Sequence, residues 1–340
     1  MKLSTPRWWY RRHGAPMPLT RFLLRPLSWI WAAVTARRIA RARPAAVDLA
    51  VISVGNLTMG GTGKTPVARA LLARLRARGL QAAGLARDYG GSEQGPLLVI
   101  PESHTAAQVG DEPLMLAADG PMFIARDRAA GAELARRCGA QAVVMDDGHQ
   151  NPSLRKSLSL VVVDGETRDG EWPFGDGAVF PAGPMREPLA AGLARADAVI
   201  LVLPDGLDAP DPELAALFAP KPVLTVRIRP TGPPPPGPLL GFAGVAKPWK
   251  VERALQAAGA ALVDFAPYPD HARLTASDLR FLRDRAEALG ARLVTTEKDF
   301  ARLSPEARTG IATFPVTAEF DDVAALDALL DKALRRWGRP

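Results

Sequence analysis

The sequence predicts an α/β protein with two domains on one chain, the larger a parallel sheet covered by helices and the second a smaller α/β domain. From residue 49 to about residue 229, short apolar runs rich in β-branched residues alternate with helical stretches, as in a parallel sheet with helices on its faces. A second alternation follows the proline-rich stretch TGPPPPGP at 231–238, which has the composition of a stiff linker. We therefore predict a larger domain over 48–230 and a smaller α/β domain over 239–340.

Residues 1–47 form a basic, aromatic arm in front of these domains. The arm holds ten Lys or Arg and no Asp or Glu, whereas the rest of the chain balances 33 basic against 36 acidic residues. Its apolar run from Phe22 to Ala36 is interrupted by Arg25 and Pro26 and is shorter than the roughly 20 residues that span a bilayer. Arginines on both sides of the run do not fit a cleavable signal peptide. The aromatic residues of the arm are Trp8, Trp9, Tyr10, Phe22, Trp29 and Trp31.

We expect this arm to contain a helix that lies on an anionic membrane surface, with its rings at headgroup depth and its cations facing the lipid. The alternative is a basic helix packed on its own domain. Because the excess positive charge is confined to the arm, a nucleic-acid partner is not expected, and no obligatory protein partner is inferred. The single cysteine, Cys138, excludes an intrachain disulfide framework and a cysteine-based zinc cluster, and fits a reducing compartment.

A glycine-rich loop follows the first strand of the larger domain. The apolar run LAVISV at 49–54 is typical of a buried parallel strand, GNLTMGGTGKTP follows at 55–66, and an amphipathic helical stretch then ends at Gly79. Strand, loop and helix in this order form a phosphate-binding loop, so the larger domain is expected to be P-loop NTPase-like. The residues expected to bind the nucleotide are Thr58, Met59, Gly60, Gly61, Thr62, Gly63, Lys64 and Thr65.

Each part of this loop has a chemical purpose. The glycines let backbone N–H groups crowd a phosphate, Lys64 reaches the β and γ oxygens, and Thr65 can hold Mg²⁺. Thr58 stands where the usual pattern has glycine. Guanine-specific proteins carry N/T-K-x-D, and the nearest string here, TEKD at 296–299, has its lysine one place late. ATP is therefore the expected nucleotide.

An acidic pair ends a second apolar run, AVVMDD at 142–147. In P-loop enzymes a carboxylate at such a strand end completes the Mg²⁺ shell, directly or through water. Asp146 and Asp147 are both candidates, and the sequence does not rank them. The alternative is that the two acids cap a turn.

Three further polar clusters lie in loops, where functional residues concentrate. Asp111 heads the helical pattern DEPLMLAAD, where it is also a good N-cap. Arg186 and Glu187 lie between two prolines, and the alternative there is an exposed surface pair. His271 follows Asp270 before a helical stretch and could equally be a solvated loop histidine. The cleft between the two domains is the default substrate site.

These strings, taken in order, resemble those of the tetraacyldisaccharide 4'-kinases, the lipid A kinases of Gram-negative bacteria, over most of the chain. The matching strings are GNLTMGGTGKTP, ARDYGG, GDEPLMLA, DDGHQ, FPAGPMREP, FAGVAKP, YPDH and TTEKD. The resemblance implies a P-loop kinase that uses ATP and Mg²⁺ at the cytoplasmic face of the bacterial inner membrane, as a peripheral or monotopic protein. It would phosphorylate the 4'-hydroxyl of a tetraacyl glucosamine disaccharide 1-phosphate, giving lipid IVA and ADP.

The resemblance also suggests residue roles. It makes Asp111 the base, paired with His271 from the second domain, and it places Arg186 and Glu187 near the reacting phosphates. It puts Lys64 and Thr65 on the phosphates and Mg²⁺, with Asp147 and Asp146 near the metal. The chain departs from the family pattern at His149, where an aromatic residue is frequent, and at Asp88, where glycine is usual.

A different class of function is a membrane-associated P-loop ATPase switch of the MinD/ParA type, which recruits partners. Those proteins carry a lysine near the start of the loop where this chain has Met59. That difference, and a further domain bearing Asp270 and His271, favour the kinase. A soluble small-molecule kinase or ligase would leave the tryptophan-rich arm unexplained.

Overall fold

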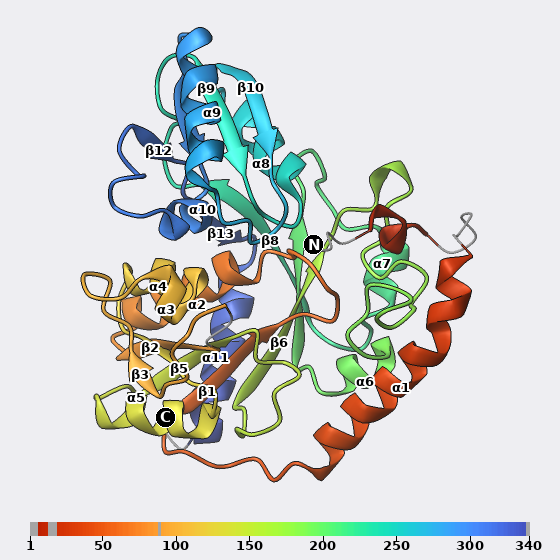
Figure 1. Ribbon diagram of the computed structural model, residues 1–340. Coiled ribbons are helices and arrows are strands. Elements are labelled where there is room, and N and C mark those ends of the chain that lie inside the picture. Colours follow the sequence, from red (N-terminus) through yellow and green to blue (C-terminus); the bar gives the residue numbers. More distant parts are fainter. Residues whose placement is uncertain (1–5, 13–18, 88–89, 338–340) are drawn as a thin grey trace.

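Two sheets, one large and one small, organise the structure (Figure 1). The computed structural model describes residues 6–12, 19–87 and 90–337. Within these residues the large sheet has nine strands in the order β13-β8-β7-β6-β1-β5-β2-β4-β3, and the small sheet has four in the order β10-β9-β11-β12. Neighbouring strands are parallel except at the two edges of the large sheet, where β13 and β3 pair antiparallel with β8 and β4. The α/β class expected from the alternation is confirmed.

The strands of the large sheet, from edge to edge, are β13 (Val316–Phe320), β8 (Val223–Pro230), β7 (Ala198–Leu203), β6 (Leu158–Asp164), β1 (Ala50–Gly55), β5 (Ala142–Asp146), β2 (Ala82–Ala86), β4 (Met122–Ile124) and β3 (Leu97–Leu98). Those of the small sheet are β10 (Leu262–Pro267), β9 (Leu239–Ala243), β11 (Arg292–Thr295) and β12 (Ile311–Thr313). The apolar runs expected as parallel strands between residues 49 and 229 lie in the large sheet.

Helices cover both faces of the large sheet, as the continuous apolar runs of its central strands require. On one face α2 and α11 bury side chains such as Leu71 and Leu330 against β1 and β6. On the other face α5, α6 and α7 pack with residues such as Leu193 and Leu214. These helices are α2 (Lys64–Ala77), α5 (Arg128–Arg137), α6 (Leu189–Ala194), α7 (Pro212–Ala216) and α11 (Val323–Trp337). Two short helices, α3 (Ala106–Val109) and α4 (Asp111–Ala117), close the edge near β4.

The small sheet has its own two-sided core. On one side α8 (Pro248–Ala257) packs through Leu255. On the other, α9 (Ala276–Ala288) and α10 (Glu297–Arg302) cover the sheet through residues such as Leu282. We call this part, residues 239–313, the smaller body, and the rest of the two-sheet structure the larger body. Residues 231–238 join β8 to β9 without a helix or strand.

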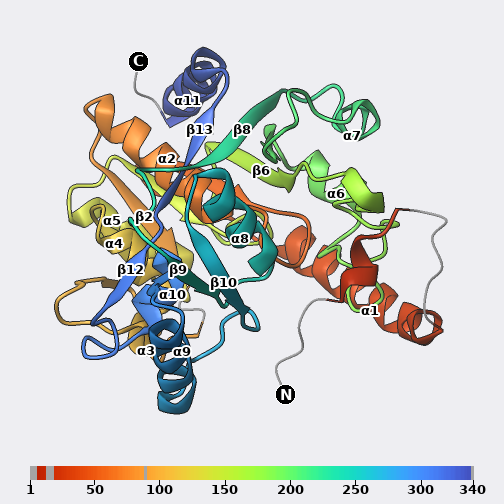
Figure 2. The ribbon, with the colours of Figure 1, turned by 90° about the horizontal axis from the view of Figure 1, so that it is seen from above.

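The expected boundary of the smaller domain, 239–340, differs from the structure in its last part. Strand β13 returns to the large sheet, where Ala318 faces Ile228 of β8. Helix α11 then packs on β1 and β6, and its Asp327 forms an ion pair with Arg74 of α2. Residues 316–337 therefore belong to the larger body, as the view from above shows (Figure 2). Alternating apolar patterns identify strands and helices but do not say which sheet an edge strand joins.

Helix α1 (Thr20–Arg41) runs along the outside of the larger body (Figure 1). Its inward face is polar, because the buried side chains are Arg21, Ser28 and Thr35, and Ser28 Oγ accepts a hydrogen bond from the Ala182 N–H at 3.0 Å. Most of its large apolar side chains are exposed instead, although Trp31 also packs against Phe180. The exposed side chains are Phe22, Leu23, Leu27, Trp29, Ile30, Trp31 and Val34. No helix among the described residues combines the length and the apolar character needed to cross a bilayer.

Candidate active site

The glycine-rich loop joins β1 to α2 at the carboxyl edge of the large sheet. Gly63 caps α2 with a φ of 84°, which glycine adopts readily, and Lys64 is the first helical residue. The first N–H groups of a helix lack intrahelical partners and carry its positive dipole end, so this turn is an anion site. Asn56 braces the loop from inside, since its amide donates to Thr62 Oγ1 at 3.3 Å and to the Gly60 carbonyl at 3.4 Å.

The structure separates the two aspartates that the sequence left unranked. Asp146 ends β5 beside β1, and its Oδ2 accepts a hydrogen bond from Thr65 Oγ1 at 3.2 Å. Asp147 lies in the following turn with a φ of 53°, and its carboxylate lies 3.6 Å from Lys64 Nζ. Burial raises the pKa of Asp146 to about 7, with a further contribution from the charge of Glu112. Asp147 is more exposed, with 42% of its side chain accessible, and partial desolvation raises its pKa less than Lys64 and Arg186 lower it, so the pKa of Asp147 lies below its ordinary value.

Asp146 and Thr65 form a donor set that fits Mg²⁺. The buried Oδ1 of Asp146 has no hydrogen-bond partner, so one oxygen of this carboxylate remains available to a cation. Carboxylate and hydroxyl oxygens suit Mg²⁺, which is usually held by one or two carboxylates together with substrate phosphates. The described part of the chain contains no group of three or more His, Cys, Asp or Glu side chains that could hold a metal by itself.

The loop at 180–188 carries Arg186 to the acidic pair. Arg186 Nη1 lies 2.9 Å from both carboxylate oxygens of Asp147, and its Nε donates to the Thr58 carbonyl at 3.1 Å. Its backbone N–H donates to the Leu57 carbonyl at 2.8 Å. Arg186 therefore links the phosphate-binding loop to the turn at Asp147, and its guanidinium lies beside both.

Glu187, the residue after Arg186, contacts a different set of side chains. It is buried, and both of its oxygens accept hydrogen bonds from Arg195 Nη2 at 2.6 Å, while Oε1 also accepts from the Gln150 amide at 3.0 Å. Gln150 in turn donates to the Asn56 carbonyl at 2.8 Å. Glu187 therefore stabilises the loop through Arg195 and Gln150 rather than by contact with Lys64.

His149 and Asp88 were the two departures from the family pattern. His149 is buried, and its ring nitrogens lie 3.2 Å from Ser159 Oγ and 3.0 Å from the Gly192 carbonyl. Burial, with the nearby charge of Lys156, lowers the pKa of His149 to about 3, so the ring is neutral and joins β6 to α6. Asp88 lies outside the described residues.

A second cluster lies where the two bodies meet. Asp111 is the first residue of α4, not its cap, and it is buried. His271, which has a φ of 56°, comes from the smaller body and places Nδ1 3.3 Å from Asp111 Oδ2. The family resemblance pairs these two residues, which are 160 positions apart in the sequence and meet in the structure. A non-glycine residue at such a φ is strained, and strain of this kind gathers at functional sites.

Sequence reasoning missed Arg302, which is central to this cluster. Its Nε lies 2.5 Å from Asp111 Oδ2, its Nη1 lies 2.6 Å from Asp299, and its Nη2 lies 3.2 Å from His271 Nδ1. Burial alone would raise the pKa of Asp111, but the hydrogen bond from His271 and the charges of Lys298 and Arg302 hold it well below its ordinary value. Asp111 is therefore ionised over the physiological pH range.

Lys298 links the two clusters. Its Nζ lies 2.7 Å from Glu112 Oε1, and the charge of Glu112 in turn raises the pKa of Asp146 at the end of β5. Lys298 and Arg302 both belong to the string TTEKDFAR, with a spacing of four that puts them on one side of α10. That spacing is evident in the sequence, but the sequence does not show that these residues contact Glu112 and Asp111 on α4.

Comparisons with known proteins identify the family of the chain. A model of the family "Tetraacyldisaccharide-1-P 4'-kinase" matches residues 20–335. The chain belongs to this family. A tetraacyldisaccharide 4'-kinase from Caulobacter sp. (strain K31) is 62% identical over 331 residues, which cover 97% of this chain and 99% of the relative. One from Phenylobacterium zucineum is 62% identical over 330 residues, with 97% and 99% covered.

A solved structure shares the fold. The crystal structure of LpxK from Aquifex aeolicus in complex with ATP superimposes with a TM-score of 0.73 at 22% identity, and the match covers 93% of this chain and 100% of that one. Membership of the tetraacyldisaccharide 4'-kinase family makes the chain a kinase.

Proposed function

We propose that this chain transfers the γ-phosphate of ATP to the 4'-hydroxyl of a tetraacyl glucosamine disaccharide 1-phosphate, giving lipid IVA and ADP. The observation that carries the proposal is the meeting of two clusters at one edge of the large sheet. Lys64 and Thr65 with Asp146 form a phosphate and metal site, and Asp111 with His271 forms an ionised carboxylate–histidine pair beside it. The charge of Glu112, next to Asp111, reaches Asp146, so the two clusters lie within electrostatic range.

The proposed roles follow from what phosphoryl transfer requires, which is alignment, charge neutralisation and an acceptor for the hydroxyl proton. Lys64 and Arg186 would neutralise charge on the phosphates. Thr65 and Asp146 would hold Mg²⁺, and Asp147 would orient Lys64 and Arg186. When bound, the metal would neutralise charge on the phosphate oxygens.

Asp111 would accept the proton of the sugar hydroxyl. Its carboxylate is ionised, so it can take a proton, and His271 would orient the carboxylate or relay the proton. Arg302 would keep Asp111 in its ionised form between turnovers. Because Asp111 and His271 come from different bodies, the pair exists only when the bodies are together.

The outward apolar face of α1 supports action at a membrane surface. Side chains such as Leu23 and Trp29 are 74% and 70% exposed, while the buried face of the same helix is polar. Exposed apolar patches of this kind mark sites of interaction. A helix with this distribution suits the headgroup layer of an anionic bilayer, and a tetraacylated acceptor resides there. We place the protein at the cytoplasmic face of the bacterial inner membrane, where ATP is available.

The direct test is to incubate the purified protein with MgATP and the detergent-dispersed acylated disaccharide phosphate and to follow the glycolipid by mass spectrometry. Addition of one phosphate to the disaccharide supports the proposal. ATP consumption that leaves the glycolipid unmodified, and that drives dimerisation instead, would contradict it and favour the ATPase switch. Omitting the acceptor is the matched control.

A further inference from the structure

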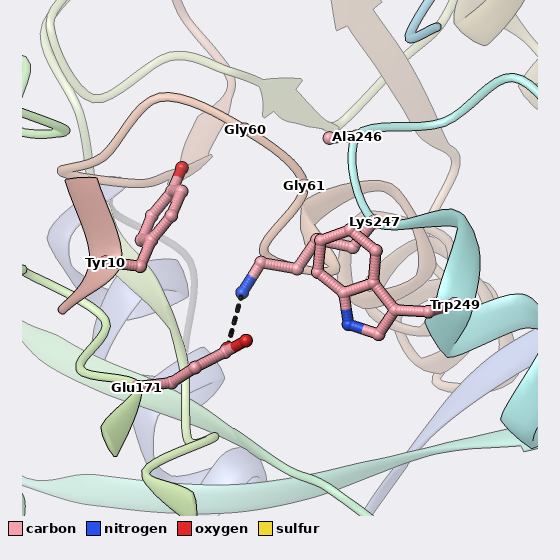
Figure 3. Close-up of a pocket in the computed structure, with 7 residues that line it drawn as sticks. All are labelled: Tyr10, Gly60, Gly61, Glu171, Ala246, Lys247 and Trp249. Carbon is pink, nitrogen blue, oxygen red and sulfur yellow. Dashed lines mark ion pairs between the residues drawn. The ribbon is translucent and has the colours of Figure 1, made fainter. Parts of the chain in front are cut away.

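The N-terminal arm reaches the phosphate-binding loop before the membrane-facing helix begins. The short helix η1 (Arg7–Tyr10) lies against the loop, and the hydroxyl of Tyr10 donates a hydrogen bond to the Met59 carbonyl. Figure 3 shows Tyr10 beside Gly60, with Lys247 and Trp249 of the smaller body facing it across a cavity of about 30 Å³. The smaller body therefore lies over Tyr10 and the loop.

Tyr10 helps to fix the backbone of Met59 in the phosphate-binding loop. The Met59 N–H donates to the Pro184 carbonyl at 2.7 Å, and the Met59 carbonyl accepts from Tyr10, so both backbone groups of Met59 are held by other parts of the chain. The next residue, Gly60, has a φ of 97°, and a Cβ added there would lie 2.8 Å from Tyr10 Oη. The ring therefore lies directly on the loop, and it fixes the position at which the backbone turns toward the phosphates.

Tyr10 is itself anchored from several directions. Its carbonyl accepts a hydrogen bond from the Trp172 N–H at 2.6 Å, and Lys247 Nζ lies 4.9 Å from the centre of its ring. Burial, with a smaller contribution from Asp164, raises the pKa of Tyr10 above its ordinary value. The hydroxyl therefore stays protonated and remains a donor.

The same arm also contacts the loop at 180–188, which carries Arg186. Trp9 and Trp31 pack edge-on against Phe180, with ring centres 6.0 and 4.9 Å away. Trp31 Nε1 donates to the carbonyl of Arg186 at 3.1 Å. Helices η1 and α1 therefore both contact the loop at 180–188, and the Arg186 side chain of that loop lies beside Asp147.

We propose that Tyr10 is a positioning residue for the nucleotide, so that the arm is part of the ATP site as well as the membrane-facing surface. Tyr10 acts by holding the Met59 carbonyl, which fixes the path of the loop at Gly60 and Gly61. The proposal rests on the proposed function only in requiring that the loop binds ATP. It predicts that nucleotide affinity depends on Tyr10 when no membrane is present.

The test compares the full-length wild type with Tyr10→Phe, which removes only the hydroxyl, and with Leu23→Asp as the matched control on the outward face of α1. Affinity for a fluorescent ATP analogue is titrated in detergent with Mg²⁺, at a temperature where circular dichroism shows each protein fully folded. Tyr10→Phe should bind the analogue about 3- to 10-fold more weakly, the range that one hydrogen bond supplies. Its sedimentation with anionic vesicles should equal that of the wild type.

Leu23→Asp should show the opposite pattern, with wild-type affinity for the analogue and reduced sedimentation with vesicles. KM for ATP should rise in Tyr10→Phe more than kcat falls, which a purely structural role for Tyr10 would not produce. Equal affinity of folded Tyr10→Phe and the wild type would overturn the inference. If the wild type itself does not bind the analogue, the proposed function fails instead.

Discussion

Arg302 is expected to set the pH range in which Asp111 can act as a base. The perturbation is Arg302→Gln, which removes the cation next to Asp111 and Asp299 while it keeps a polar side chain. Both carboxylates are buried, with 8% and 6% of their side chains exposed, and Arg302 lies within 2.6 Å of each. Losing one partner of a buried pair costs about 3–5 kcal/mol of stability, so a lower melting temperature is expected.

The sign of the pH effect follows from the pKa of Asp111. In the wild type this pKa is lowered, so the stability that the ionised carboxylate contributes is present above its unfolded pKa and is lost only as the pH falls through the folded value. In Arg302→Gln, His271 and Lys298 still oppose the effect of burial but the guanidinium no longer does, so the pKa of Asp111 rises. An opposite charge at this distance shifts a carboxylate by about 1–3 pH units, and the acid limb of activity should move up by that amount.

The assay is kcat/KM for the glycolipid at saturating ATP from acid to alkaline pH, expressed as the ratio of variant to wild type. Taking the ratio cancels the titration of ATP itself. The ratio should be constant at alkaline pH and fall on the acid side, while Arg302→Lys, which keeps the charge, should fall less. A ratio independent of pH, with a lower melting temperature alone, would refute the reasoning and leave Arg302 a purely structural residue.

Three further predictions test the separate parts of the site. Asp111→Ala should lose about 10²–10⁴-fold in turnover with unchanged ATP affinity in equilibrium titration, and near-normal turnover would remove Asp111 from the base role. Lys64→Ala should reduce turnover at least as much and also weaken ATP binding, because we propose that its charge faces the β and γ oxygens; undiminished affinity in the same titration would place the phosphates elsewhere. Deleting residues 1–43 should move the protein from the membrane pellet to the supernatant after centrifugation, and an unchanged partition would reject the membrane role of α1.

Much of the fold could be predicted because local patterns determine it. LAVISV is apolar at every position except Ser53, as a strand buried on both faces must be, and β1 is indeed central. The glycine-rich loop was recognisable because its function requires particular residues at fixed spacing. The acidic pair was found in the same way, from carboxylates that follow an apolar strand.

The remaining parts depend on contacts that no local pattern contains. Arg302 and Asp111 are 191 residues apart, and their contact exists only because the smaller body closes onto α4. The ranking of Asp146 and Asp147 depends on where β5 ends and the left-handed turn begins. Tyr10 shares the composition of a membrane-facing arm, yet its hydroxyl is held by the phosphate-binding loop.

The return of β13 to the large sheet makes the smaller body an insertion within the larger one. The chain leaves the large sheet at Pro230 and re-enters it at Val316, and these two residues are paired across the strands. During synthesis the ribosome must therefore finish the whole insertion before the edge strand and α11 can be added. Until then the outer side of β8 has no partner strand and one face of β1 is not covered by α11, so these surfaces are exposed in the partly synthesised chain.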